Sequence, residues 1–243
     1  MWKENQDAFG HSIYDYLKGE AEFQIVERDD GDIGSIKLGV YFNQYKDWHP
    51  IEKKAMRYVR GRVLDIGCGA GRHALYLQEK GHDVVGIDNS PLAIKVCKER
   101  GLRDARVVPI TRINSKLGIF DTVIMMGNNF GLFGSFEKAK QLLGKLSKII
   151  SQSGRIITTT NDVYDTDIPE HLAYHAANRS KGRMSGQLRI RVRYKTYSTP
   201  WFDYLIVSKN EMENILEGTG WVVTKYIDSD ISYYMAILEK KHL

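Results

Sequence analysis

The sequence predicts an α/β fold: a doubly wound, mostly parallel, seven-stranded sheet with an antiparallel last strand and helices on both faces. Two observations predict it. Between residues 61 and 160, short β-rich apolar runs alternate with amphipathic helical stretches, which is typical of a parallel sheet covered by helices. Near the end, two β-rich runs are joined only by Asp228-Ser229-Asp230, and so short a connection forces an antiparallel hairpin.

The elements of this core follow in chain order. Ser90 is a good N-cap and Pro91 suits the first helical position, so a helix starts there and ends near Gly101. The run 120–126 is nearly all apolar, as in a strand buried on both faces. The expected strands are 62–66, 83–87, 105–108, 120–126, 154–160, 221–227 and 231–239, and the other expected helices are 71–80, 135–150 and 208–217.

Two segments lie outside the core. Residues 1–60 form an expected N-terminal helical cap or lid, with helices at 5–17 and 50–59 and a turn at 29–32. Residues 161–200 form an expected β-containing insertion on the substrate side. The cofactor-binding core is then 61–160 together with 201–243.

Length and composition limit the class of protein. The 243 residues suit one α/β domain with a modest insertion. No apolar run approaches the roughly 18–20 residues that cross a bilayer, so no membrane association is expected. The first residues lack the apolar stretch of a secretory signal, and two cysteines are too few for a disulfide framework. These features indicate a cytoplasmic protein, and the net charge of +5 permits an anionic partner without requiring one.

A glycine-rich turn follows the first core strand, in Val63-Leu64-Asp65-Ile66-Gly67-Cys68-Gly69-Ala70-Gly71. Glycines let the backbone bend sharply and approach a ligand closely. The spacing is G-x-G-x-G, and Arg72 stands where a dinucleotide fingerprint has its third glycine. Asp65 would repel a pyrophosphate, but it can bind an ammonium group.

A second acidic residue, Asp88, ends the next strand, 21 residues after Gly67. A carboxylate there can accept hydrogen bonds from both hydroxyls of a ribose. Asn89 follows it and is placed to assist.

Together these residues resemble motifs I and II of the class I S-adenosylmethionine (SAM)-dependent methyltransferases, and the terminal hairpin resembles that family's reversed last strand. The resemblance covers roughly residues 60–160 and 205–240. It implies SAM as cofactor, with its methionine half near Asp65, Gly67 and Gly69 and its ribose at Asp88. The cofactor-binding residues that it implies also include Cys68, Gly71, Asn89, Met126 and Gly127.

The sequence departs from the family after the third strand, where many members carry an acidic residue that contacts the adenine. This chain has Thr111 and Arg112 there as candidates. The N-terminal aromatics Tyr41 and Trp48 are expected either to close the cofactor pocket, as in other members, or to be ordinary core residues.

In this family the loop after the fourth strand faces the transferable methyl group. Here it is Gly127-Asn128-Asn129-Phe130, which differs from the Asn-Pro-Pro-Tyr of many enzymes that methylate planar nitrogens. Methylation of adenine N6 or glutamine N5 is therefore less expected. Asn128 and Asn129 are catalytic candidates, or residues of a capped loop.

The insertion contains further candidates for a general base or substrate ligand. Tyr164 lies just past the fifth strand. His171, Tyr174, His175 and Asn178 share one face of a possible helix, which could equally pack on the core. The histidine pair lacks an obvious third ligand, so no metal is expected.

A basic strand occupies Leu188 to Lys195, where Arg189, Arg191, Arg193 and Lys195 alternate with apolar residues. With the cations from 179 onward they form a basic 179–195 face. This face could bind RNA or a phosphate-bearing substrate, or it could be a solvated sheet face that discourages aggregation. Asp203, on an expected partner strand at 201–207, could pair with one of its charges.

The leading hypothesis is a methyltransferase that transfers the methyl group of SAM to an oxygen, nitrogen or carbon atom of a small-molecule acceptor. One alternative is methylation of RNA or another polyanion through the basic face. Another is a SAM- or nucleotide-binding protein without transferase activity. The sequence does not indicate the oligomeric state.

Overall fold

The computed structural model describes residues 2–241, and these divide into two compact units. Unit 1 holds the described residues up to His49, together with Arg60–Ile113 and Arg189–Phe202. Unit 2 holds Pro50–Val59, Asn114–Leu188 and the described residues from Asp203 onward.

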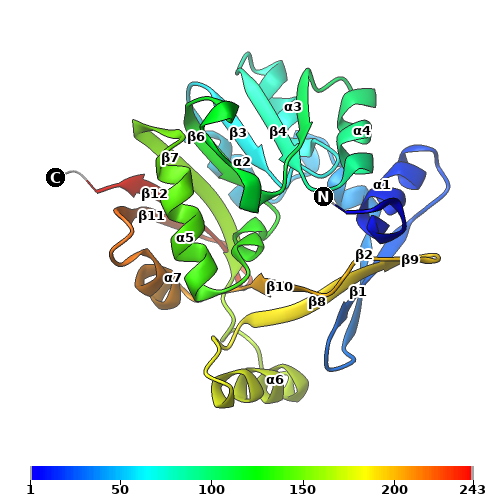
Figure 1. Ribbon diagram of the computed structural model, residues 1–243, viewed down its shortest axis with the longest axis vertical. Coiled ribbons are helices and arrows are strands. Elements are labelled where there is room, and N and C mark those ends of the chain that lie inside the picture. The colour runs from blue at the N-terminus through cyan, green and yellow to red at the C-terminus, as the bar shows by residue number, and fades with distance from the viewer. Residues whose placement is uncertain (1, 242–243) are drawn as a thin grey trace. The chain divides into compact units, whose positions relative to one another are not determined.

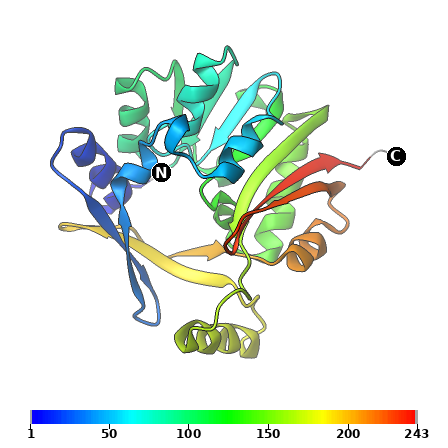
Figure 2. The same ribbon diagram turned by 180° about the vertical axis from the view of Figure 1, so that it is seen from behind.

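Seven strands form the main sheet in the order β11-β12-β7-β6-β3-β4-β5. Within unit 1, β3, β4 and β5 are parallel. Within unit 2, β6 and β7 are parallel, while β12 runs antiparallel to both β7 and β11, as Figure 2 shows. The strands are β3 (Val63–Ile66), β4 (Val84–Asp88), β5 (Asp104–Val107), β6 (Phe120–Met125), β7 (Ile150–Asn161), β11 (Trp221–Asp228) and β12 (Tyr233–Lys240). The predicted α/β fold with its antiparallel last strand is confirmed.

Seven α-helices lie within residues 2–241. Ser90 caps the helix that starts at Pro91, as predicted, by accepting a hydrogen bond from the Ala93 N–H. Ser208 and Glu211 form a capping box at the start of the last helix, where each side chain bonds the backbone of the other. The helices are α1 (Ala8–Leu17), α2 (Pro50–Met56), α3 (Arg72–Glu79), α4 (Pro91–Glu99), α5 (Phe136–Ser147), α6 (Pro169–Ser180) and α7 (Lys209–Leu216).

The boundary between α5 and β7 differs from the prediction. The helix was expected to reach residue 150, but it ends at Ser147, and β7 already starts at Ile150, which pairs with Phe120 of β6. Leu146, Ile149 and Ile150 are all apolar and buried. Hydrophobic periodicity therefore could not separate the end of the helix from the start of the strand.

The N-terminal segment is not wholly helical, which corrects the expectation. Its helices α1 and α2 are present, but β1 (Phe23–Arg28) and β2 (Ile33–Lys37) form an antiparallel hairpin around the predicted turn. This hairpin belongs to a second, five-stranded sheet of order β10-β8-β1-β2, in which β9 also pairs with β8 (Figure 1). The other members of that sheet are β8 (Gln187–Tyr194), β9 (Tyr197–Ser198) and β10 (Phe202–Leu205).

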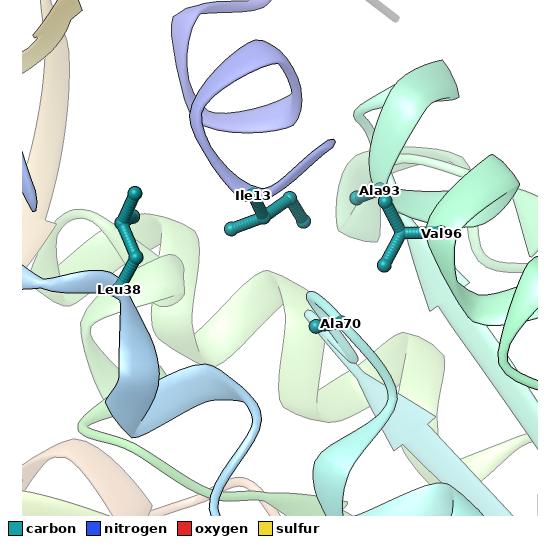
Figure 3. Close-up of a cluster of buried hydrophobic side chains, with 5 residues drawn as sticks. All are labelled: Ile13, Leu38, Ala70, Ala93 and Val96. Atoms are coloured by element: carbon teal, nitrogen blue, oxygen red, sulfur yellow. The ribbon is translucent and has the colours of Figure 1, made fainter. Parts of the chain in front are cut away.

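A small apolar cluster packs the N-terminal helix onto the glycine turn and α4 within unit 1. Figure 3 shows Ile13 of α1 directed toward Ala93 and Val96 of α4, with Ala70 of the glycine turn below them. Leu38, which starts a 3-10 helix after β2, completes the cluster. All five side chains are at most 1% exposed, so α1 belongs to the core of this unit.

No helix within residues 2–241 is both long enough and apolar enough to span a lipid bilayer.

Candidate functional site

The glycine turn has a backbone that only glycine adopts freely. Gly67, Gly69 and Gly71 have φ angles of 71°, 54° and 80°, in the left-handed region where a side chain is strained. The Gly67 N–H donates to the Ile87 carbonyl at 2.8 Å, which fastens the turn to β4. Gly71 forms the N-cap of α3. The three glycines therefore shape an open turn between a buried strand and a helix.

Asp65, on β3 before this turn, carries a buried oxygen without a partner. The residue is 2% exposed, and Oδ2 accepts no hydrogen bond. Burial, and next the repulsion of Asp88, raise the pKa of its carboxyl to about 7. An unsatisfied buried oxygen costs about 1–3 kcal/mol, so this atom is well suited to a cationic hydrogen-bond donor.

Asp88 ends β4 and is held by the backbone on both sides. Its Oδ2 accepts from the Gly69 N–H at 3.1 Å, and its Oδ1 accepts from the Ser90 N–H at 2.9 Å. Burial is the main reason why its pKa is raised to about 6. Each carboxylate oxygen can accept a second hydrogen bond, so Asp88 is oriented and still has capacity for two donors.

Cys68 and Asn89, two further predicted cofactor-binding residues, lie beside Gly67 and Asp88 in the chain. The Cys68 Sγ lies 3.8 Å from the Cys97 Sγ inside unit 1, and burial together with its contact to Cys97 raises the pKa of the Cys68 thiol. Asn89 follows Asp88, and its carbonyl accepts from the Trp2 N–H at 3.5 Å.

Thr111 and Arg112 lie in the 3-10 helix Ile110–Arg112 after β5, and both are exposed. Their proposed contact with an adenine stays a prediction.

The aromatic residues near the turn include one that the sequence analysis missed. A Cβ atom added to Gly69 would lie 3.4 Å from the Phe9 ring, so Phe9 of α1 covers the turn. Tyr41 packs edge-on against Phe9 with ring centroids 5.2 Å apart, and its hydroxyl accepts from the Gln24 side chain at 3.1 Å. Phe9 lies within the predicted helix 5–17, and no sequence pattern marked it as different from a core residue.

Trp48 lies in a separate aromatic cluster. Its ring packs edge-on against His73 and Tyr76, and its Nε1–H donates to the Asn43 carbonyl at 2.9 Å. With 3% of its surface exposed, Trp48 has the surroundings of a core residue. A role of Trp48 in closing the cofactor pocket stays a prediction.

In unit 2, the chain after β6 turns through Met126, Gly127 and Asn128. Asn128 has a left-handed φ of 66°, which is strained for a residue other than glycine. Its N–H donates to the Thr159 hydroxyl at 3.0 Å, and its carbonyl accepts from the Tyr204 hydroxyl at 2.6 Å. Its side-chain Oδ1 is buried without a partner, so the strained backbone presents a free acceptor atom.

A second unpartnered oxygen lies on the adjacent strand. Thr160, near the carboxyl end of β7, is fully buried and its hydroxyl has no hydrogen-bond partner. Asn129 begins the 3-10 helix Asn129–Phe133. No sequence pattern singles out Thr160, because threonine is common in strands and the missing partner of its hydroxyl is visible only in three dimensions.

The candidate catalytic residues of the insertion form hydrogen bonds with neighbouring side chains or are buried on α6. The Tyr164 hydroxyl donates to the Glu211 carboxylate at 2.9 Å, and burial raises its pKa. His171 Nδ1 lies 3.1 Å from the Thr166 hydroxyl. Tyr174 is 8% exposed on the buried face of α6, together with His175 and Asn178, as the helical spacing predicted. Among residues 2–241, no group of three or more His, Cys, Asp or Glu side chains is arranged to hold a metal ion.

The basic strand is confirmed as β8, but acidic residues pair with its charges. Glu27 of β1 accepts hydrogen bonds from Arg191 at 2.9 Å and from Arg193 at 3.0 Å. Asp15 of α1 accepts from Lys195 at 2.7 Å, and Lys195 lies just past the strand, with a φ of 49°. Inside unit 1, three cations of the run are therefore paired with two acidic side chains.

Asp203, in unit 2, accepts from Lys138 at 3.1 Å and from Arg183 at 3.5 Å. The expected pairing of Asp203 with one of the 179–195 cations is thus present at Arg183.

Comparisons with known proteins agree with this geometry. The methyltransferase domain family matches residues 63–154, from β3 into β7. A solved SAM-dependent methyltransferase from Bacteroides fragilis, in complex with S-adenosyl-L-homocysteine, shares 26% identity and a TM-score of 0.84 over 99% of this chain and 97% of its own.

Two curated relatives are also methyltransferases. The 2-heptyl-1-hydroxyquinolin-4(1H)-one methyltransferase of Mycobacteroides abscessus is 44% identical over 130 residues, and the chain spans about half of its length (51% of each). The glycine/sarcosine N-methyltransferase of Aphanothece halophytica is 25% identical over 71% of each chain. With its glycine turn, its acidic residues on β3 and β4 and its seven-stranded Rossmann-like sheet, the chain is similar to the class I SAM-dependent methyltransferases.

Proposed function

We propose that the protein transfers the methyl group of SAM to an oxygen, nitrogen or carbon atom of a small-molecule acceptor. The observation that carries this proposal is the unpartnered, buried Oδ2 of Asp65 beside the glycine turn. SAM carries an ammonium group that would satisfy this oxygen, and it has no phosphate that Asp65 would repel. When bound, SAM supplies an electrophilic methyl group on a positively charged sulfur.

The residues of unit 1 fit the rest of that cofactor. Asp88 is already oriented by two backbone N–H groups and would accept hydrogen bonds from the ribose hydroxyls. The glycines of the turn would let the methionine half approach the backbone. We assign Phe9 and Tyr41 to the cover of this site, and we keep Thr111 and Arg112 as the proposed neighbours of the adenine.

We propose that unit 2 holds the acceptor, near Met126, Gly127, Asn128 and Thr160. Asn128 Oδ1 and Thr160 Oγ1 are hydrogen-bonding atoms without partners, which suits an acceptor that presents an O–H or N–H group. Methyl transfer by in-line displacement depends largely on positioning, so a strained and firmly held Asn128 is a suitable orienting residue.

The nature of the relatives supports a small acceptor rather than a polyanion. The names of two relatives describe methylation of a hydroxyquinolinone and of glycine or sarcosine. The pairing of Arg191, Arg193 and Lys195 with acidic side chains also leaves less free positive charge for RNA. The cytoplasmic location expected from the sequence stays a prediction.

Calorimetric titration with S-adenosylhomocysteine (SAH) tests the cofactor. We expect Kd near the micromolar range for the wild type and an increase of about tenfold or more, about 1.4 kcal/mol, for Asp88→Ala. The control is Asp83→Ala. It removes an exposed carboxylate directly before β4, at the opposite end of the strand from Asp88, and this variant should bind SAH as the wild type does. Absence of SAH binding by folded wild-type protein would refute the proposal.

Turnover distinguishes a transferase from a protein that only binds the cofactor. Labelled SAM should be offered with 2-heptyl-1-hydroxyquinolin-4(1H)-one, with glycine and with sarcosine, and then with fractionated small-molecule extracts. Transfer of label to a small molecule supports the proposal. Transfer only to RNA would replace the small-molecule acceptor by a polyanion.

A further inference from the structure

Asp7 caps two helices at once. At the N-cap of α1, its Oδ1 accepts a hydrogen bond from the Gly10 N–H at 3.0 Å. Its Oδ2 accepts from the Ser90 hydroxyl at 2.8 Å and from the Leu92 N–H at 3.2 Å, at the start of α4. The residue is 1% exposed. A negative charge at a helix N-terminus is favourable, and here one buried carboxylate serves two such ends.

Ser90 connects Asp7 to the proposed ribose-binding carboxylate. The Ser90 hydroxyl donates to Asp7, and the Ser90 backbone N–H donates to Asp88 Oδ1 at 2.9 Å. The other Asp88 oxygen accepts from Gly69 in the glycine turn at 3.1 Å. A continuous chain of hydrogen bonds therefore runs from α1 through Ser90 and Asp88 to the turn.

The same helical turn of α1 also contacts the glycine turn directly. Phe9, two residues after Asp7, lies over Gly69, and its ring packs against Tyr41. The other contacts between α1 and α4 include the apolar contacts of Ile13 with Ala93 and Val96 (Figure 3) and a hydrogen bond from Lys95 to the Tyr14 hydroxyl at 3.2 Å, farther along both helices. Apolar contacts are non-directional, whereas the hydrogen bonds of Asp7 fix the position of the helix along its neighbour.

We infer that Asp7 is a positioning residue that fastens α1 over the cofactor site and thereby sets how long the cofactor stays bound. The inference rests on the proposed function, because it requires SAM or SAH to bind beside Asp88 and Gly69. If the cofactor binds under Phe9, its release requires the first turn of α1 to move. The bonds from Asp7 to Ser90 and Leu92 oppose that movement.

Asp7→Asn is the most specific variant. Asparagine has the same shape and is an equally good N-cap, so it can still accept from Gly10. Its amide nitrogen is a donor, however, so it cannot accept from the Leu92 N–H. The Ser90 hydroxyl, which already accepts from the Ala93 N–H, would have to turn and accept a second hydrogen bond instead of donating one. The substitution therefore separates the link between the helices from the ordinary capping of α1.

The test combines SAH dissociation, measured by stopped-flow displacement, with hydrogen exchange of residues 4–17. We expect SAH to leave Asp7→Asn about fivefold faster or more than the wild type, with faster exchange in α1. Both proteins are measured where urea titration shows that they are fully folded. The control is Ser135→Ala, which removes the N-cap of α5 in unit 2 and should lower stability without changing the release rate.

The outcomes separate this inference from the proposed function. Failure of the wild type to bind SAH would refute both the proposed function and the role of Asp7. Wild-type binding with unchanged release and unchanged α1 exchange in Asp7→Asn overturns the role of Asp7 and leaves the proposed function standing. Equal acceleration by Ser135→Ala would also overturn it, because the effect would then be general destabilisation.

Discussion

Gly10→Ala tests how closely α1 approaches α4. A Cβ atom at Gly10 would lie 2.4 Å from the Ser90 hydroxyl oxygen and 2.5 Å from Asp7 Oδ2. Both distances are far below van der Waals contact. Neither neighbour can move easily, because Ser90 is fully buried, Asp7 is 1% exposed, and a hydrogen bond joins them. The methyl group must therefore push the helices apart or break that bond.

The expected magnitude follows from opposing contributions. Alanine is favoured over glycine inside a helix by about 1 kcal/mol. Overpacking costs about 1–3 kcal/mol, and losing a hydrogen bond to a charged group costs about 1.5–3 kcal/mol. Both costs together, less the gain from alanine, lead us to expect that Gly10→Ala lowers the free energy of unfolding by about 1.5–5 kcal/mol, the reverse of the usual sign.

Urea unfolding of two variants decides the question. Gly144 lies inside α5, and a Cβ atom there would meet nothing within 4 Å, so Gly144→Ala should show the ordinary gain of about 1 kcal/mol. The midpoint should move to lower urea for Gly10→Ala and to higher urea for Gly144→Ala. If both substitutions raised the midpoint, the reasoning about the close approach of α1 and α4 would be refuted.

Three further predictions concern charge. Burial raises the pKa values of Asp65 and Asp88 to about 7 and about 6, so both carboxylates become protonated as the pH falls and SAH binding should weaken. Calorimetry at about pH 8 and about pH 5.5 should therefore show a larger Kd for SAH at the lower pH. In the cofactor-free protein, these two carboxyl groups bind more protons in the folded state than in the unfolded state from about pH 4 to about pH 7. Their contribution therefore makes the free energy of unfolding fall as the pH rises through that window. Comparison with Asp65→Asn isolates this contribution, and a contribution that rises with pH would contradict the prediction. Glu27→Gln removes the negative charge that pairs with Arg191 and Arg193. The protein should then bind heparin, a polyanion, more tightly and elute at a higher salt concentration. Unchanged elution would mean that these arginines do not face solvent.

The sequence predicted those features that depend on residues close together in the chain. The glycine turn, Asp65 before it and Asp88 at the next strand end could be assigned because a strand, a tight turn and a helix follow one another within about 25 residues. Ser90 and Pro91 marked the start of α4 for the same reason. The structure confirms these local elements almost residue by residue.

The hairpin of β1 and β2 escaped prediction because its burial pattern is reversed. Phe23 is 55% exposed, whereas Gln24 and Arg28 are buried at 2% and 7%. Gln24 is satisfied by Ser12 and Tyr41, and Arg28 by Asp30, so the polar side chains face inward at little cost. A strand whose large apolar residue faces outward gives no signal to hydrophobic periodicity.

The sequence by itself therefore determined the fold class and the cofactor-binding motif, because both are written in short-range patterns of glycine, acidic and apolar residues. Only the tertiary structure decided which atoms lack partners and which charges are neutralised. Glu27 reaches Arg191 and Arg193 across more than 160 positions, and Asp7 reaches Ser90 across 83. Such contacts depend on how strands and helices pack, and packing is a property of the folded chain that no local pattern records.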